Sequence, residues 1–231
     1  AALKQIKDEK TNIITVEDPV EYQLDGITQV QIFEDIGLTF GSSLRSILRQ
    51  DPDVLLIGEI RDEETADIAV KFSLTGHLVF STVHANDAPG TLTRLLDIGI
   101  APFLVGSCLN LVMAQRLVRK LCDKCKESYA PTADELALIG LETKDVKGEL
   151  NKAKGCADCR NTGYRGRTAI FEMIPMAREL RKLVFDSANE DEIRQAAIKN
   201  GMVTLRDAGN ERVLDGTTSV EEVLRSTVED L

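Results

Sequence analysis

The chain has 231 residues, enough for one large or two modest domains, and its 43% apolar and 29% charged residues are typical of a folded protein. Its 28 basic and 38 acidic residues give a net charge of −10, which argues against non-specific DNA binding because that binding depends on neutralising phosphates. The absence of Trp and an aromatic content of 4% argue against an aromatic platform for single-stranded nucleic acid.

In chain order, the first half alternates strand and helix signals. Short apolar or alternating runs predict strands, and longer runs with apolar residues at helical spacing predict helices. Their alternation predicts an α/β sheet with helices on its faces. The predicted strands cover residues 12–16, 28–33, 54–57 and 77–83, and the predicted helices cover residues 1–7, 40–48, 63–74, 88–97 and 102–118.

The longest apolar stretch, residues 100–114, is shorter than the roughly 20 residues that cross a bilayer. We expect a buried helix there. The N-terminus lacks the basic, apolar and small-residue pattern of a secretory signal. Because the chain begins with Ala1 inside an expected helix, we expect it to be a fragment of a longer protein.

The last part of the chain is predicted to be helical. Asn189 with Glu192 and Ser219 with Glu222 have the spacing of capping boxes, and Gly201 fits a helix stop. We expect these helices to form a small bundle. They are predicted near residues 176–186, 190–200, 205–215 and 219–229.

Four of the five cysteines form two C-x-x-C pairs, Cys122 with Cys125 and Cys156 with Cys159. Without a secretory signal, such pairs favour a structural zinc site over disulfides, over a redox pair and over unrelated thiols. The 30 residues between the pairs exceed the usual spacing of about 15–20, so an insertion must loop out between them. Cys108 stands alone in the apolar stretch and is interpreted as a buried core residue.

The segment that carries these pairs is basic. Residues 116–167 hold 12 Lys or Arg against 8 Asp or Glu, and they end in the string Gly163-Tyr-Arg-Gly-Arg167. The simpler interpretation of this charge is a solvated face that also compensates the thiolates. A patch that binds a partner is the alternative.

The strongest local signal is the string from Leu48 to Asp62, LRQDPDVLLIGEIRD. Nucleoside triphosphatases place a carboxylate beside Mg²⁺ and the γ-phosphate at the end of an apolar strand. Here Gly58 would let the backbone come close, and Glu59 would lie at the carboxyl end of the strand, where open α/β sheets bind ligands. Glu59 could orient the attacking water or act as its base, although many strands end in an acidic residue.

Two other predicted strands carry polar residues at their ends. A solvated turn is the simpler interpretation of each carboxylate after the first strand taken alone. The two histidines of the chain, His77 and His84, flank the fourth strand on opposite faces, so a shared metal is not expected. Either could hydrogen-bond a phosphate or the Glu59 carboxylate. The carboxylates after the first strand are Glu17, Asp18 and Glu21.

Residues 12–22, 48–62 and 75–84 resemble the Asp box, Walker B motif and His box of the secretion ATPase superfamily. The four cysteines followed by Gly-Tyr-x-Gly-Arg resemble its branch of type II secretion and type IV pilus assembly ATPases, whereas pilus retraction ATPases as a group lack them. The resemblance covers residues 12–231. It implies an α/β fold: a partial RecA-like P-loop NTPase core with a tetracysteine zinc-binding insertion and a C-terminal helical bundle.

The organisation that this implies has three segments. Residues 1–118 would be the ATPase core, residues 119–167 the tetracysteine zinc-binding segment, and residues 168–231 the C-terminal helical subdomain.

The resemblance also implies roles for the candidate site. Glu59 would be the catalytic glutamate, and His77 and His84 would couple the nucleotide state to their strand. Glu59, Asp18 and His84 would contact ATP and its Mg²⁺. The remaining carboxylates of the Asp box, Glu17 and Glu21, would also lie near Mg²⁺ and the attacking water.

Arg61 would lie close to this site, with a salt bridge to Asp62 or Glu63 as the alternative. The zinc ligands would be Cys122, Cys125, Cys156 and Cys159.

One departure from the family is large. Phosphate binding in the family needs a Gly-rich loop with Gly-Lys-Ser/Thr, and none of the 16 glycines here is followed by Lys. Residues 1–10 resemble the tail of the helix that this loop opens. We therefore expect this chain alone to bind ATP weakly and to hydrolyse it negligibly.

The resemblance implies that the parent protein is a cytoplasmic, homohexameric ATPase, peripheral at the inner membrane, that powers type II secretion or type IV pilus assembly. ATP, Mg²⁺ and zinc would be its cofactors, and an inner-membrane platform protein and an adaptor its partners. A non-catalytic module that docks on the platform protein is the second hypothesis. A zinc-ribbon nucleic-acid factor is disfavoured by the net charge of −10.

Overall fold

A computed structural model describes residues 2–146 and 148–227 of the chain. These residues form two compact units. The first unit comprises Ala1–Ala85, Pro89–Asn110 and Met176–Arg194, and the second comprises Asn86–Ala88, Leu111–Pro175 and Gln195–Leu231. None of the helices in the described residues is long and apolar enough to cross a membrane.

The first unit is built on a four-stranded parallel sheet with the order β2-β1-β3-β4. The central strands are continuous apolar runs, as expected for strands buried on both faces. Since all four strands run the same way, their carboxyl ends meet at one edge of the sheet. The strands are β1 (Ile13–Glu17), β2 (Thr28–Gln31), β3 (Val54–Ile57) and β4 (Leu78–Ser81).

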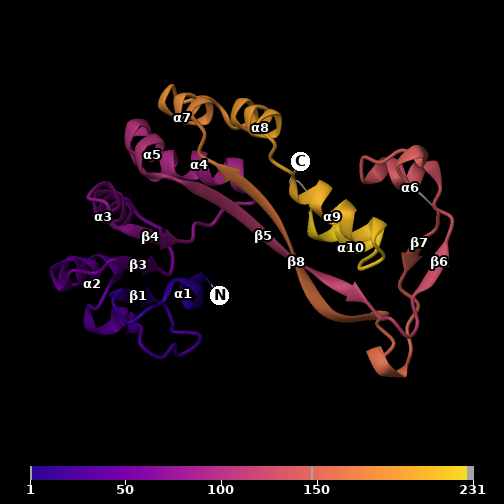
Figure 1. The fold of residues 1–231 in the computed structure, drawn as a ribbon, viewed down its shortest axis with the longest axis horizontal. Coiled ribbons are helices and arrows are strands. Elements are labelled where there is room, and N and C mark those ends of the chain that lie inside the picture. Colours follow the sequence, from indigo (N-terminus) through magenta and orange to yellow (C-terminus); the bar gives the residue numbers. More distant parts are fainter. Residues whose placement is uncertain (1, 147, 228–231) are drawn as a thin grey trace. The chain divides into compact units, whose positions relative to one another are not determined.

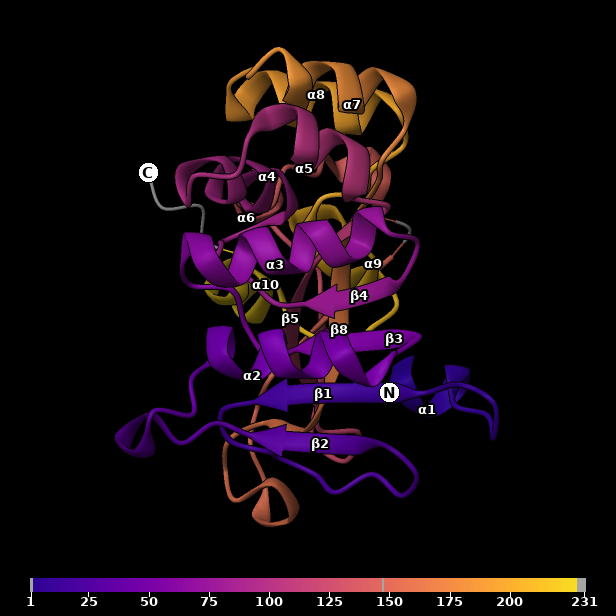
Figure 2. The same cartoon turned by 90° about the vertical axis from the view of Figure 1, so that its left-hand side faces the viewer.

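Two helices cover one face of this sheet, α2 (Phe40–Ile47) and α3 (Glu63–Leu74) (Figure 2). Each begins at a polar cap: the Thr39 side chain accepts from the Ser42 N–H, and the Asp62 side chain accepts from the Thr65 N–H. The predicted strands and helices up to residue 97 are confirmed, with small differences at their ends. The other helices of this unit are α1 (Ala2–Ile6), most of α4 (Ala88–Asp97), α5 (Pro102–Cys108) and α7 (Arg178–Phe185), and the boundary between the two units falls inside α8 (Glu190–Lys199).

The prediction of one helix over residues 102–118 is wrong. Helix α5 ends at Cys108, and strand β5 (Leu111–Leu121) begins three residues later. Exposed and buried side chains alternate along its first half, which is the period of a strand and not of a helix. The apolar composition misled the prediction because the alternation becomes visible only where β5 pairs with a distant strand.

That partner is β8 (Tyr164–Pro175), and the two strands form a long antiparallel ribbon, the core of the second unit (Figure 1). Helices α9 (Leu205–Leu214) and α10 (Val220–Ser226) pack against it. A second two-stranded sheet, β6 (Glu127–Tyr129) with β7 (Leu150–Lys152), lies in the insertion between the cysteine pairs with helix α6 (Ala133–Leu138). Its small core contains Leu136, Ile139, Leu150, Val213, Val220 and Val223.

The four C-terminal helices are present as predicted. Helix α7 belongs to the first unit, where it packs against α5, whereas α9 and α10 belong to the second unit and pack on the ribbon and on each other. Residues 228–229 of the last predicted helix lie outside the described residues.

The division into three segments expected from the sequence stays a prediction. The tetracysteine segment and the helices α9 and α10 share the second unit. Four short 3₁₀ turns complete the described structure: η1 (Glu34–Ile36), η2 (Leu48–Gln50), η3 (Thr143–Asp145) and η4 (Ala157–Cys159).

Candidate active site and candidate metal centre

Most of the predicted site residues lie at the carboxyl edge of the parallel sheet. Glu17 is the last residue of β1, and Asp18 follows it. Glu59 comes two residues after β3, and His84 three residues after β4. Parallel pairing therefore brings together residues that are up to 67 positions apart in the sequence.

Glu59 is the centre of a three-residue cluster. Its Oε2 lies 2.8 Å from Nε2 of His84, and its Oε1 lies 2.5 Å from Nη2 of Arg61. The Glu59 side chain is only 13% exposed, whereas those of Arg61 and His84 are 57% and 82% exposed. A nearly buried carboxylate is thus held by two cations or donors that face solvent.

This arrangement fixes the charge of Glu59. The hydrogen bond from Arg61 is the main cause that lowers the pKa of the Glu59 carboxyl; burial acts in the opposite direction, and the bond to His84 lowers the pKa further. The Arg61 guanidinium responds with a raised pKa, caused first by Glu59 and at longer range by Asp18 and Glu34. Glu59 is therefore ionised at neutral pH.

The backbone around Glu59 is held closely against β1 and β4. The Gly58 N–H donates to the Val16 carbonyl at 2.7 Å, and the Thr82 hydroxyl donates to the Gly58 carbonyl at 2.6 Å. A Cβ at position 58 would lie 3.1 Å from the Val16 carbonyl oxygen and 3.3 Å from Cα of Glu17. The close approach that the sequence predicted for this glycine is confirmed, and it sets the position from which Glu59 projects.

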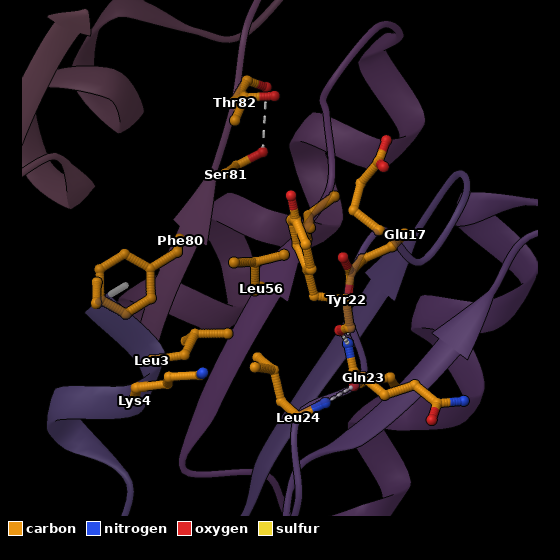
Figure 3. Close-up of a pocket in the computed structure, with 14 residues that line it drawn as sticks. Leu3, Lys4, Glu17, Tyr22, Gln23, Leu24, Leu56, Phe80, Ser81 and Thr82 are labelled. Carbon is orange, nitrogen blue, oxygen red and sulfur yellow. Dashed lines mark hydrogen bonds between the residues drawn. The ribbon is translucent and has the colours of Figure 1, made fainter. Parts of the chain in front are cut away.

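A cavity of about 610 Å³ opens beside β1, β3 and β4 (Figure 3). Phe80, Leu56 and Tyr22 give it an apolar wall, and α1 closes one side with Leu3 and Lys4. Two predicted site residues, Glu17 and Glu21, line it as well.

Gln29 of β2 is a site residue that the sequence reasoning missed. Its Nε2 donates to Oε1 of Glu17 at 2.9 Å and to the Tyr22 carbonyl at 3.0 Å, and its Oε1 accepts from the Leu24 N–H at 2.7 Å. The Thr15 hydroxyl also donates to Oε1 of Glu17, at 2.6 Å. Gln29 thus orients both Glu17 and the 22–24 loop. No signal in the alternating run 28–33 marks it, because its role depends on the pairing of β2 with β1.

His77 does not join the cluster around Glu59. It directly precedes β4, at the amino end of the strand, and its ring stacks on Phe72 with centroids 4.0 Å apart. Its Nδ1 lies 2.9 Å from the Thr75 hydroxyl oxygen. His77 and His84 lie apart because they flank opposite ends of β4.

The edge offers oxygen ligands for Mg²⁺ in Glu17, Asp18 and Glu59, a donor type that suits this ion. In residues 2–146 and 148–227, however, the only group of three or more potential ligand atoms close enough to share an ion is formed by cysteines. Mg²⁺ commonly completes its shell with water and substrate phosphates, so one or two of these carboxylates would suffice.

The candidate metal centre consists of Cys122, Cys125, Cys156 and Cys159, whose sulfurs all lie within 4.8 Å of one another. Sγ of Cys122 lies 3.9 Å from Sγ of Cys156, and Sγ of Cys159 lies 3.8 Å from those of Cys125 and Cys156. A tetrahedral zinc with Zn–S bonds of about 2.3 Å places its sulfurs about 3.8 Å apart. The distances fit zinc and are far longer than a disulfide bond of about 2.05 Å.

Backbone N–H groups support this centre. Those of Cys156 and Gly163 donate to Sγ of Cys159, each at 3.2 Å. Burial acts to raise the pKa of the Cys159 thiol, but these two donors together with the Cys156 and Cys125 side chains lower the pKa to about 6. Burial raises the pKa of the Cys125 thiol to about 12. Metal binding would therefore release protons, because thiolates and not thiols are the ligands.

Two relatives with curated names match the whole length of this chain. It is 51% identical over 233 residues to the type IV pilus assembly ATPase PilB of Myxococcus xanthus, covering 100% of this chain and 41% of the relative. It is 50% identical over 230 residues to the type II secretion system protein E of Pseudomonas aeruginosa, covering 100% of this chain and 45% of that protein. The chain thus spans less than half the length of these relatives.

The fold resembles two solved structures. The crystal structure of the pilus retraction motor PilT with bound ADP matches with a TM-score of 0.69 and 23% identity, over 99% of this chain and 56% of that one. The ATPase DotB of Legionella pneumophila matches with a TM-score of 0.64 and 19% identity, over 94% of this chain and 51% of that one.

A sequence model of the family described as "Type II/IV secretion system protein" matches residues 1–225. This match covers the catalytic candidates and the four cysteines alike. Together with relatives that are about half identical over the full chain, it confirms the resemblance found in the sequence motifs. The chain belongs to the type II/IV secretion system protein family.

Proposed function

We propose that this chain is the catalytic-edge and zinc-bearing part of an ATPase that powers type II secretion or type IV pilus assembly. The observation that carries the proposal is the ionised, nearly buried Glu59 held between Arg61 and His84 at the carboxyl edge of the sheet. Open α/β sheets bind their ligands at this edge. The designations of the relatives supply the substrate, ATP.

In this proposal Glu59 orients the water that attacks the γ-phosphate. Each carboxylate oxygen has two lone pairs, so the bonds to Arg61 and His84 leave acceptors for a water proton. Because its pKa is lowered, Glu59 stays ionised as a hydrogen-bond acceptor and is a weak base. The geometry therefore supports water positioning more strongly than proton abstraction.

The other residues of the edge supply charge. Asp18 and Glu17 would hold Mg²⁺, which when bound neutralises the β- and γ-phosphate oxygens. Arg61 and His84 are exposed cations or donors within reach of developing negative charge next to Glu59. We also propose that the zinc site is structural, because all four ligands are protein thiols and no position is left open for a substrate.

This chain lacks the sequence motif that gives such ATPases their affinity for the phosphates of ATP. A Gly-Lys-Ser/Thr loop is missing from its sequence, and backbone N–H groups of such a loop supply most of the binding to phosphates. The chain alone is therefore proposed to bind ATP weakly. Micromolar ATP affinity of the 231-residue chain in a calorimetric titration would contradict this part of the proposal.

The decisive experiment measures ATP hydrolysis by the longer parent chain, extended upstream through its phosphate-binding loop. We expect Glu59→Gln to lower kcat by roughly 10²-fold or more, because a positioned water is lost, with little change in the Kd for ATP. Glu211→Gln makes the same chemical change at an exposed position of α9 in the second unit and should leave kcat unchanged. Equal activity of the Glu59→Gln and Glu211→Gln enzymes would refute the assignment.

The proposed parent is a cytoplasmic homohexamer that associates with the inner membrane through a platform protein and an adaptor. A second candidate function, docking without catalysis, is favoured by the basic tetracysteine segment of the second unit, in which Lys120 and Lys124 are exposed. A pull-down with cytoplasmic loops of the platform protein, before and after charge reversal at Lys120, Lys124 and Lys126, tests it. Loss of capture together with unchanged ATPase activity would favour docking as the role of this segment.

A further inference from the structure

One face of the β5–β8 ribbon carries exposed apolar side chains along its length. Alternate residues of β5 are exposed while their neighbours are buried, and β8 shows the same alternation from residue 170 onward. Met113 and Met173 stand directly opposite each other across the ladder and are 51% and 44% exposed. Contiguous exposed apolar patches of this kind mark interaction sites. The ribbon face, as it is called below, consists of Leu111, Met113, Leu117, Phe171 and Met173.

Two arginines of β8 lie at one end of this face. Arg165 and Arg167 are exposed and make no ion pair with any residue that the structure describes, in contrast to Lys124 and Lys154 of the same unit, which pair with acidic residues. Arg167 stands opposite Arg119 in the ladder, and Arg119 is already paired with the buried Glu222. Arg165 and Arg167 therefore stay available to an acidic partner from another chain.

The first unit carries a loop of the complementary character. Phe33 and Ile36 are 51% and 79% exposed, and Glu34 and Asp35 between them are exposed and make no ion pair within residues 2–146 and 148–227. The loop is preformed: the Phe33 and Leu38 backbones pair at 3.0 and 3.1 Å, and Gly37 closes η1 with a φ of 78°. A preformed loop loses little entropy on binding. Residues 33–36 are called the acidic loop below.

We propose that the acidic loop of one copy of this chain docks on the ribbon face of a second copy. Phe33 and Ile36 would cover the exposed methionines, while Glu34 and Asp35 would pair with Arg165 and Arg167 of the other copy. The ribbon face is apolar and basic at one end, and the acidic loop is apolar and acidic at its centre. Because one copy of the chain carries both surfaces, this complementarity favours a second copy as the partner. The two surfaces differ, so the contact is head-to-tail and extends to a ring or a filament.

The contact would also reach the candidate active site. The Ile32 N–H donates to the Glu17 carbonyl at 2.9 Å, so the acidic loop, which follows Ile32 directly, borders the carboxyl edge of the sheet. Docking would bring two arginines of the neighbouring copy towards this edge. The inference rests on the proposed assembly of the parent into a ring. Its test measures association and not ATP hydrolysis, so a failure of the docking proposal can be distinguished from a failure of the proposed ATPase function.

The test uses sedimentation velocity of the 231-residue chain at increasing concentration. We expect reversible, salt-sensitive association that Glu34→Arg with Asp35→Arg weakens by roughly tenfold or more, and that Arg165→Glu with Arg167→Glu weakens equally, because like charges then face each other. A mixture of the two variants should associate again, since each then offers the charges that the other lacks. Glu9→Arg with Asp97→Arg, a matched reversal of two exposed acidic residues, should have no effect.

Circular dichroism establishes that the variants are folded; all substituted side chains are exposed, so their stability should stay within about 0.5 kcal/mol of the original chain. Three results would overturn the proposal. The chain could stay monomeric at every concentration, the mixed variants could fail to associate, or only the ribbon reversal could have an effect. The last result would assign the ribbon face to a different acidic partner.

Discussion

At the scale of single residues, the charge on Glu59 depends on two neighbours that lie in different parts of the sequence. Arg61 is two positions away; the sequence predicts it close to this site, with a salt bridge to Asp62 or Glu63 as the alternative. Asp62 is instead the N-cap of α3, where its carboxylate accepts from the Thr65 N–H at 2.8 Å. The Asp62 carboxylate thus caps the helix, and Arg61 pairs with Glu59 instead.

Arg61→Ala should raise the pKa of Glu59, because the bond from Arg61 is the main cause that lowers it. The carboxylate would then take up its proton at a higher pH than in the unaltered chain. Carbon-13 NMR of the Glu59 carboxyl group, followed against pH, measures the midpoint directly and needs no ATPase activity. Arg49→Ala removes an exposed arginine in η2 and serves as the control. An identical midpoint in all three chains would show that Arg61 does not set this charge.

At the scale of elements, a buried carboxylate joins three of them in the second unit. The fully buried Glu222 of α10 accepts from the backbone N–H of Arg119 on β5 at 2.9 Å and from its guanidinium at 2.6 Å. Arg225 donates to it from one turn further along α10, at 2.6 Å. The Arg119 guanidinium lies 4.0 Å above the ring of Tyr164 on β8, and the Tyr164 and Ser219 hydroxyls are 2.7 Å apart.

This network explains why only half of a predicted capping box forms at α10. The Ser219 hydroxyl accepts from the Glu222 N–H at 3.2 Å, as the motif requires. The Glu222 carboxylate, however, turns to the two arginines instead of returning to the backbone of Ser219. At α8, by contrast, Asn189 and Glu192 form the complete box. Bonds to charged partners are stronger than a neutral cap.

Glu222→Gln should lower the free energy of unfolding at pH 7 by about 2 kcal/mol, because it removes one partner of a buried, hydrogen-bonded charge network. Burial acts to raise the pKa of Glu222, but Arg225 and Arg119 lower it from 4.5 to about 2. A lowered pKa stabilises the folded chain above pH 4.5, and this stabilisation is lost as the pH falls towards 2.

Urea unfolding at pH 7, 4 and 3 measures the effect. The difference between the two chains should be largest at pH 7 and shrink at each lower pH. Glu221→Gln, an exposed neighbour on the same helix, should change little at any of these values. A difference that stays constant between pH 7 and 3 would mean that the charge of Glu222 is not what stabilises the second unit.

At the scale of the whole molecule, the stability of the two units should respond differently to metal. The four cysteines all belong to the second unit, where the Cys122 N–H donates to the Gly163 carbonyl at 2.9 Å and so ties one pair to the other. The small sheet of β6 and β7 in this unit rests on a core of a few aliphatic side chains. Zinc binding contributes free energy of folding in such domains.

Chelation of zinc should therefore lower the Tm of the second unit by about 10 °C or more, while the first unit unfolds as before. Calorimetry of the chain with and without chelator, alongside metal analysis, records both transitions. Cys125→Ser should reproduce the loss, and Cys108→Ser, which alters the lone cysteine of α5, should retain the metal. Unchanged calorimetric transitions after complete removal of zinc would contradict a structural role.

Much of this molecule follows from the sequence alone. The strand over residues 54–57 and the helices over 63–74 and 88–97 have the predicted bounds, because a short apolar run and a capped amphipathic run are local properties. The cysteine pairs and the glutamate after an apolar strand are equally local, so they indicate a candidate metal centre and a candidate catalytic residue without coordinates.

What only the tertiary structure decided concerns pairs of distant segments. Residues 111–118 have enough apolar character for either helix or strand, and their pairing with β8, some 50 residues later, makes them a strand. Gln29 meets Glu17 only because β2 pairs with β1, and His84 meets Glu59 only because β4 pairs with β3. Local preference is small compared with the free energy of burying an apolar face against a partner. The partner strand therefore determines the conformation, and the sequence near a residue does not show which segment that partner is.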